Sequence, residues 1–207
     1  MILDGALLSM SGHLRLAPPS PADDQFFAAL RCHPETQRYI PFLPDQFTPE
    51  EARERRAVRA ADETLVDFSI YTVASESESS TKYVGAIGIF HIDDSYKSCE
   101  AGISIWPESF RRGIATDAMH RLLTHVFEER RLNRVVFHTG VNNVRMRGWL
   151  ERFGAILEGT LRAGNDGHGG YMDACLYSIL EKDWTTTVKA KLEERIKLMS
   201  GLGDIRD

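Results

Sequence analysis

The residues best suited to chemistry lie at positions 106–118, where two arginines and a glycine precede a predicted helix. The first turn of a helix carries unpaired backbone N–H groups and the positive end of the helix dipole, so it binds anions. Gly113 lets the main chain approach a pyrophosphate, and small Ala115 keeps the helix start uncovered. Arg111 and Arg112 add positive charge. The stretch predicts a phosphate-binding loop; the alternative is an ordinary strand-to-helix turn with two solvated arginines.

The spacing in this loop argues against two common nucleotide sites. The loop lacks the Lys-Ser or Lys-Thr ending of a P-loop and the triple-glycine spacing of a dinucleotide-binding fingerprint. Residues 108–162 contain ten arginines, no lysine and six acidic residues, a balance of +4, whereas the whole chain carries −5. The local excess of positive charge predicts an anionic ligand. The acidic remainder argues against nucleic-acid binding by the whole surface.

A set of strands and helices must position this loop. Before the loop, the hydrophobic pattern predicts a strand at 13–16, helices at 26–30 and 49–61, and strands at 66–73, 83–92 and 100–106. Thr48 precedes Pro49 and caps the second helix, whose Arg and Glu content predicts a solvent-facing position. Polar linkers at 75–81 and 93–97 indicate that the last three strands are antiparallel neighbours.

The second half of the chain alternates helices and strands before a final helix. The pattern predicts a helix at 113–130, a strand at 134–139, a helix at 144–153 ended by Gly154, and strands at 155–161 and 171–180 joined by a glycine-rich loop at 164–170. One apolar stripe predicts the last helix: Trp184, Val188, Leu192 and Ile196. A helix between the fourth and fifth strands, after an antiparallel meander, predicts a mixed α/β fold with a parallel pair inside the sheet.

The composition is that of an ordinary folded protein. The chain has 207 residues, 43% of them hydrophobic and 27% charged, which predicts one domain at 1–183 with a helical extension at 184–207 packed on it. Apolar runs such as 84–90 are too short to span a membrane, and no leader pattern opens the chain. Cys32, Cys99 and Cys175 form no close pair, so neither a disulfide framework nor a CxxC zinc site is predicted. We expect a cytoplasmic protein with no metal.

Four segments resemble one known family. YVGAIGIFHID, EAGISIWPESFRRGIATDAMHRLL, NVRMRGWLERFGAILEGTLR and YMDACLYSILEKDW occur in the order found in the GNAT N-acetyltransferases. Within that family they are most similar to the branch that includes the ribosomal-protein N-terminal acetyltransferases. The resemblance covers about 13–184. It implies a GNAT fold, with a mostly antiparallel mixed sheet of about seven strands, a central parallel pair, flanking helices and a C-terminal helix.

The resemblance also implies acetyl-coenzyme A as co-substrate. Its pyrophosphate would bind the loop at 111–116, and its pantetheine arm would lie where strands 100–106 and 134–139 splay apart. Asn143 would bond the pantetheine arm, or cap a helix, or do both. The implied coenzyme-binding residues are Ile103, Ser104, Ile105, Phe110, Arg111, Arg112, Gly113, Ile114, Ala115, Thr116, Asn143 and Arg152.

Two positions depart from the family pattern. Phe110 stands where the family often has Gln or Arg, which leaves binding by backbone amides intact. Met146 stands near the position of a Ser or Tyr whose hydroxyl meets the coenzyme sulfur in relatives. Because Met donates no proton, the leaving thiolate would take its proton from solvent or from a tyrosine elsewhere.

Acetyl transfer to an amine needs a neutral nucleophile, a polarised thioester carbonyl and a proton for the thiolate. Backbone N–H groups near 103–105 are expected to polarise the carbonyl. Glu100 is the candidate base, directly or through water; the alternative is a solvated charge at a strand edge. Asp173 is the rival carboxylate, placed to fix a cationic amine, and Tyr177 is the candidate acid, with Tyr171 beside it as a second.

Two strand histidines complete the candidates. Because the histidine side chain in general ionises near neutrality, His91 and His138 are plausible bases, although a lone strand histidine is more often structural. Arg147, like Arg152, lies on a predicted helix within reach of adenosine phosphates or in solvent.

The partners expected from the sequence are acetyl-coenzyme A and an acceptor amine, either a small molecule or a peptide N-terminus. Specificity is expected in segments 42–61 and 164–171. We expect neither nucleic acid nor membrane as partner and leave a homodimer open. Two alternatives remain: a non-catalytic acyl-coenzyme A sensor, which Met146 favours, and an interaction scaffold whose arginines contact an acidic protein.

Overall fold

The computed structural model of the chain describes residues 5–40, 42–73, 80–167 and 170–203. Its centre is an eight-stranded sheet in the order β1-β2-β3-β4-β5-β6-β8-β7. The strands are Leu7–Leu8 (β1), Leu14–Ala17 (β2), Val66–Thr72 (β3), Tyr83–Asp93 (β4), Ser98–Ile105 (β5), Arg134–Gly140 (β6), Ile156–Gly167 (β7) and Gly170–Leu180 (β8). Of these described strands, only β5 and β6 pair in parallel. The predicted mixed sheet with an internal parallel pair is confirmed.

The parallel pair follows from a crossover helix. α4 (Ile114–Thr124) continues as a π-helical turn over His125–Glu129 and returns the chain from β5 to β6. In the described structure β5 and β6 pair only through residues 98–100 and 134–136. Beyond Glu100 the strands separate, so the N–H and C=O groups of β5 that face this gap lack a partner strand. The sheet therefore opens as a wedge with Glu100 at its apex.

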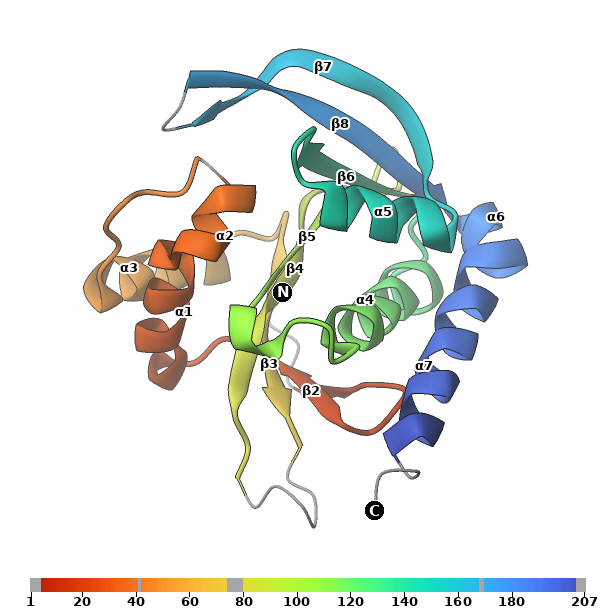
Figure 1. Cartoon of the computed structure of the whole chain (residues 1–207), viewed down its shortest axis with the longest axis horizontal. Helices are drawn as coiled ribbons and strands as arrows, with labels where there is room; N and C mark the ends of the chain where they lie inside the picture. The colour runs from red at the N-terminus through yellow and green to blue at the C-terminus, as the bar shows by residue number, and fades with distance from the viewer. Residues whose placement is uncertain (1–4, 41, 74–79, 168–169, 204–207) are drawn as a thin grey trace.

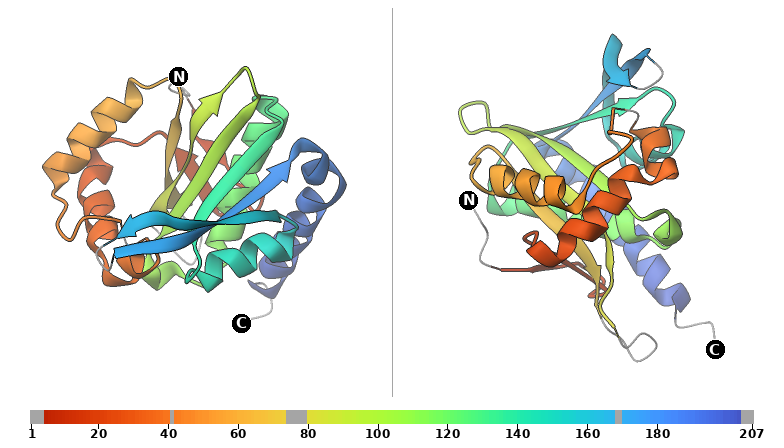
Figure 2. Two further views of the ribbon diagram at one scale, coloured as in Figure 1. Left: turned by 90° about the horizontal axis from the view of Figure 1, so that it is seen from above. Right: turned by 90° about the vertical axis from the view of Figure 1, so that its left-hand side faces the viewer.

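Helices cover both faces of the sheet (Figure 1 and Figure 2). α1 (Asp24–Cys32), α2 (Pro34–Tyr39) and α3 (Pro49–Ala60) lie on one side, where α1 contacts β4 and α3 contacts β3. α4 and the C-terminal helix α7 (Lys189–Gly203) lie on the other side and contact each other. α5 (Val144–Phe153) contacts β7. The open wedge of the sheet thus faces helices from both halves of the chain.

Local sequence signals are reproduced closely. Thr48 Oγ1 accepts a hydrogen bond from the Glu51 N–H at 3.2 Å, and the Glu51 carboxylate accepts one from the Thr48 N–H at 2.7 Å. This capping box starts α3 at the predicted residue. α5 has both of its predicted ends, and Gly154 stops it in the left-handed conformation with φ 99°.

The apolar stripe of the last helix is buried as predicted. Trp184, Val188, Leu192 and Ile196 are 0–2% exposed. Trp184 opens a π-helical turn, Trp184–Val188, after the short helix α6 (Glu181–Asp183). Its ring stacks on Phe127 with centroids 5.7 Å apart, and its Nε1–H donates to Glu128 at 2.9 Å. The C-terminal helix is therefore fixed to the end of the crossover helix.

Three features differ from the predictions. β1 and α2 were not predicted, because a two-residue strand shows no alternation and PETQRY has no apolar period. The predicted loop at 164–170 is largely strand, since β7 runs to Gly167 and β8 begins at Gly170. A register shift between Leu161 and Asn165 absorbs the extra residues of β7. The serine-rich loop at 75–79 and the loop tip at 168–169 lie outside the described residues.

A membrane-spanning helix is not found in the described ranges, since no helix there is both long and apolar enough.

Candidate functional site

A cavity of about 1220 Å³ lies between α1–α3 and the open wedge of the sheet. Its walls come from β3–β6, the loop before α4 and the start of α5. Pockets for drug-sized ligands usually have volumes of roughly 300–1,000 Å³, so this cavity is large enough for two ligands.

The loop before α4 has the geometry of an anion site. Gly113 is the N-cap of α4 with φ 78°, and Arg111 before it has φ 64°. The first helical hydrogen bonds run from Thr116 and Asp117 N–H to the Gly113 carbonyl. The N–H groups of Ile114 and Ala115 therefore precede the hydrogen-bonded turns and are available to a phosphate. The predicted phosphate loop has the required backbone shape.

The C-terminal helix covers one side of this loop. A Cβ on Gly113 would lie 2.7 Å from both the Sδ and the Cε atom of Met199. Met199 and Arg195, both on α7, line the cavity. The expectation that the helix start is uncovered is thus wrong on this side. Nothing in the spacing of the loop indicates that the C-terminal helix reaches it, because Gly113 and Met199 lie 86 residues apart in the chain.

Most residues expected to bind coenzyme line the cavity: Ile103, Ser104, Ile105, Phe110, Arg111, Gly113, Ile114, Ala115, Thr116, Asn143 and Arg152. Arg112 is exposed and is not among the described lining residues. The Asn143 Oδ1 accepts from the Met146 N–H at 3.1 Å, so the helix-cap role is present. The Thr116 hydroxyl accepts from the Trp149 Nε1–H at 3.1 Å, which ties the start of α4 to α5.

Glu100 lies at the apex of the wedge between two histidines. Its Oε1 is 3.0 Å from Nδ1 of His138, and its Oε2 is 3.3 Å from Nδ1 of His91. The Glu100 side chain is only 17% exposed, whereas that of His91 is 79% exposed. His91 has φ 52° and lies in the register shift between Phe90 and Asp93, where a bulge turns it toward Glu100. The structure therefore brings together Glu100, His91 and His138, which the sequence gives as separate candidates.

Two other predicted catalytic residues lie elsewhere. The Asp173 carboxylate accepts from the Ala163 N–H at 2.9 Å, next to the β7 irregularity. The Tyr177 side chain is fully buried and donates its hydroxyl to Glu151 at 2.5 Å. Burial and then the Glu151 carboxylate raise the pKa of Tyr177. Neither residue belongs to the described lining of the cavity, and neither does Tyr171, which is 76% exposed.

An aromatic and cationic contact at the cavity was not predicted. The Arg145 guanidinium lies 5.3 Å from the ring centroids of both Tyr39 and Phe110. It thereby joins α2, the phosphate loop and α5. Arg147, by contrast, donates to the Val141 carbonyl at 2.8 Å and is not among the described lining residues. Met146 lines the cavity and brings no hydroxyl.

Within the described ranges, no group of three or more His, Cys, Asp or Glu side chains is placed to hold a metal ion.

Comparison with known proteins gives one family. The sequence profile of the acetyltransferase (GNAT) domain matches residues 13–156. "Putative ribosomal N-acetyltransferase YdaF" of Bacillus subtilis (strain 168) is 36% identical over 100 residues, which are 48% of this chain and 55% of that protein. The chain thus spans about half the length of that curated relative.

Two solved structures share the fold. Mycobacterium smegmatis RimJ in complex with CoA-disulfide superposes with a TM-score of 0.77 at 19% identity, covering 92% of this chain and 93% of that chain. Spermidine N-acetyltransferase from Vibrio cholerae, in complex with CoA and spermine, gives 0.74 at 22% identity, covering 84% and 99%. At these identities the likeness concerns the fold.

Proposed function

The chain belongs to the acetyltransferase (GNAT) domain family, and on that premise we propose that it transfers an acetyl group from acetyl-coenzyme A to a primary amine. Both substrates would be bound together, and the amine would attack directly. The observation that carries the proposal is the separation of β5 and β6 beside the left-handed loop at Gly113. The cavity of about 1220 Å³ extends from this loop to α1–α3, which allows both substrates to bind.

The residues present fit the coenzyme. The free N–H groups at the start of α4 and the Arg111 side chain would hold the pyrophosphate. The amide of Asn143 and the unpaired backbone of β5 beyond Glu100 would hold the pantetheine arm. N–H groups of residues 103–105 would polarise the thioester carbonyl. When bound, acetyl-coenzyme A supplies the activated acetyl group.

Glu100 is the proposed general base. Its carboxylate lines the cavity and can accept the amine proton directly or through one water. His138 and His91 contact its two oxygens and would orient the carboxylate. Because His91 is 79% exposed, it offers a path for the proton to solvent.

The leaving thiolate would take its proton from water or from Tyr39. Tyr39 is the one tyrosine among the described lining residues. The earlier candidate, Tyr177, donates its hydroxyl to Glu151 and is fully buried.

An acyl-coenzyme A sensor without catalysis is the second candidate, favoured by Met146 in place of a hydroxyl. A thiol-release assay with acetyl-coenzyme A and a panel of amines tests the choice, alongside a thermal-shift titration with desulfo-coenzyme A. The enzyme proposal expects a raised melting temperature and amine-dependent thiol release. A melting shift with no release for any amine would favour the sensor. Absence of any shift with a folded protein would contradict both.

A further inference from the structure

One wall of the cavity is formed by residues of β3, β4 and β5, and it extends from Glu100 toward β3. Asp67 on β3 pairs with Gly88 on β4, and Gly88 pairs with Gly102 on β5, so all three share one face of the sheet. Gly102 lies two residues from Glu100 on that same face. At about 4.8 Å between strands and about 3.4 Å per residue, the Cα atoms of Asp67 and Glu100 lie about 12 Å apart. The Asp67 carboxylate lies over Gly88 and the Phe90 ring lies over Gly102, and all four residues line the cavity.

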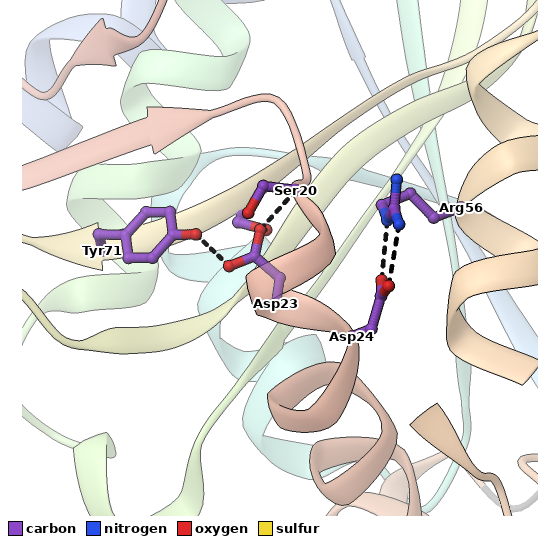
Figure 3. Close-up of polar contacts among 6 residues, drawn as sticks. Ser20, Asp23, Asp24, Arg56 and Tyr71 are labelled. Atoms are coloured by element: carbon purple, nitrogen blue, oxygen red, sulfur yellow. Dashed lines mark hydrogen bonds and ion pairs between the residues drawn. The ribbon is translucent and has the colours of Figure 1, made fainter. Parts of the chain in front are cut away.

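Four arginines line the cavity on the side of α1 and α3: Arg31, Arg55, Arg56 and Arg59. Two of them have carboxylate partners. Arg56 bonds Asp24 through two nitrogens at 2.8 and 2.9 Å (Figure 3). Arg59 bonds Asp67 in the same two-pronged way, with the second contact at 2.7 Å. Arg56 and Arg59 are therefore already paired with carboxylates of the chain.

Arg31 and Arg55 have no hydrogen-bonded or ion-paired carboxylate in the described part of the chain. The Nε atoms of both are buried without a hydrogen-bond partner. The Arg31 guanidinium lies 4.8 Å from the Phe47 ring centroid and 5.6 Å from that of Phe27, so two aromatic rings flank it. A buried donor without a partner is costly, so this pair is suited to an anion from outside the chain.

The electrostatic environment agrees with that geometry. Burial, followed by the positive charge of Arg55, lowers the pKa of Arg31 to about 10. Burial, followed by Arg59, lowers the pKa of Arg55, and Asp67 opposes this only in part. Both guanidinium groups are therefore desolvated and repelled by their neighbours, and a bound anion would relieve both effects.

The remaining acids of this region are already engaged. The Asp23 carboxylate accepts from the Ser20 N–H at 2.7 Å and from the Tyr71 hydroxyl (Figure 3). It also accepts from the Ser69 hydroxyl at 3.0 Å. Glu35 has its ion pair with Arg38, at 3.5 Å. Thr36 adds a further polar group, because its hydroxyl is buried, lines the cavity and has no partner among the described residues.

Resting on the acetyl transfer proposed above, we propose that Arg31 and Arg55 bind an anionic group of the acceptor. The acceptor is then an amine that also carries a carboxylate or phosphate, with its amine at Glu100 and its anion at α1 and α3. Thr36 supplies a further hydrogen bond. A polycationic amine would meet the two unpaired guanidinium groups and is disfavoured at this end of the cavity.

The test compares acceptors that differ only in the anion. Acetylation rates are measured with ω-amino carboxylates of increasing chain length and with the corresponding neutral ω-amino amides. Because a hydrogen bond to a charged group is strong, we expect kcat/KM for the best carboxylate to exceed that of its amide by about 10- to 100-fold. Arg55→Gln and Arg31→Gln should raise KM for the carboxylate by a similar factor and leave the amide unaffected.

Two further arms distinguish the source of the anion. ω-Amino phosphonates report a preference for phosphate, and short peptides with Asp or Ala at the second residue report an acidic peptide N-terminus. Arg53→Gln is the matched control, since Arg53 lies on the same helix α3 but is exposed and outside the cavity lining. It should leave every KM unchanged.

Equal kcat/KM for carboxylates, phosphonates, acidic peptides and their neutral analogues would overturn this inference while leaving acetyl transfer intact. Failure to acetylate any amine would instead refute the proposed function. In that case, calorimetry of N-acetyl carboxylate binding to the coenzyme-saturated protein tests the Arg31 and Arg55 site without any need for catalysis. The comparison of carboxylate with amide uses the wild-type enzyme, so it remains valid even if an arginine variant does not fold.

Discussion

The Oε1 atom of Glu100 lies 3.0 Å from Nδ1 of His138, across the point where two parallel strands separate. The pair places a carboxylate and an imidazole at the apex of the wedge, on the wall of the cavity. A proton accepted there can move along hydrogen-bonded groups, since His91 contacts the other oxygen of Glu100 and is open to solvent. The proposed base is therefore positioned by a contact between β5 and β6.

Replacing the carboxylate tests this arrangement. Glu100→Gln should lower kcat by about 10²–10⁴-fold, the usual scale for a positioned base, and leave the desulfo-coenzyme A affinity unchanged. Glu63→Gln, at an exposed acid, is the control and should have wild-type activity. A Glu100→Gln enzyme with wild-type rate and pH profile would show that the amine loses its proton without this residue.

Gly113 and Met199 can be tested as a pair. Gly113→Ala forces a side chain into φ 78° and against Met199, so we expect a loss of stability of about 1–2 kcal/mol. In a Met199→Ala background, Gly113→Ala should lose only the stability that the left-handed backbone costs, because the clash with Met199 is gone. Denaturant unfolding of both single variants and the double variant measures the coupling. Fully additive effects would contradict a direct contact between the two residues.

Two leucines of α7 provide a matched pair for the C-terminal helix. Leu192 is fully buried and Leu198 is 55% exposed. Leu192→Ala should reduce the free energy of unfolding by about 2–5 kcal/mol, whereas Leu198→Ala should change it by no more than about 0.5 kcal/mol. Urea unfolding of both variants provides the measurement. Similar losses for the two would show that α7 does not dock through its apolar stripe.

The ion pair between Glu158 and Arg134 predicts a pH dependence of stability. The Glu158 carboxylate accepts hydrogen bonds from Arg134 and from the Ser178 hydroxyl, and these, the Arg134 bonds first, lower its pKa to about 2. Because the folded pKa lies below the unfolded value, the stabilisation is complete above the unfolded pKa of about 4.5 and is lost as pH falls toward 2. Glu158→Gln should therefore cost stability at pH 7, and the difference from wild type should shrink as the pH is lowered. A difference that stays constant across this range would exclude the ion pair as its cause.

The sequence by itself determined the elements whose signals are local. The capping box at Thr48 and the left-handed stop at Gly154 act within one helical turn, so the ends of α3 and α5 follow from neighbouring residues. The stripe from Trp184 to Ile196 likewise requires a helix, whatever covers it. The order of elements also required a parallel pair, because a crossover helix returns the chain in the same direction.

Only the tertiary structure decided which side chains from distant parts of the chain contact one another. In the sequence, Glu100, His91 and His138 are separate candidate bases on predicted strands, and only the bulge in β4 and the pairing of β5 with β6 bring them together. In the same way, the direction of the Tyr177 hydroxyl toward Glu151 depends on how α5 packs over β8. Strand register and helix packing are long-range properties, since each contact joins residues far apart in the chain. Residue type and spacing carry the chemistry that a side chain can perform, and packing decides which other groups it meets.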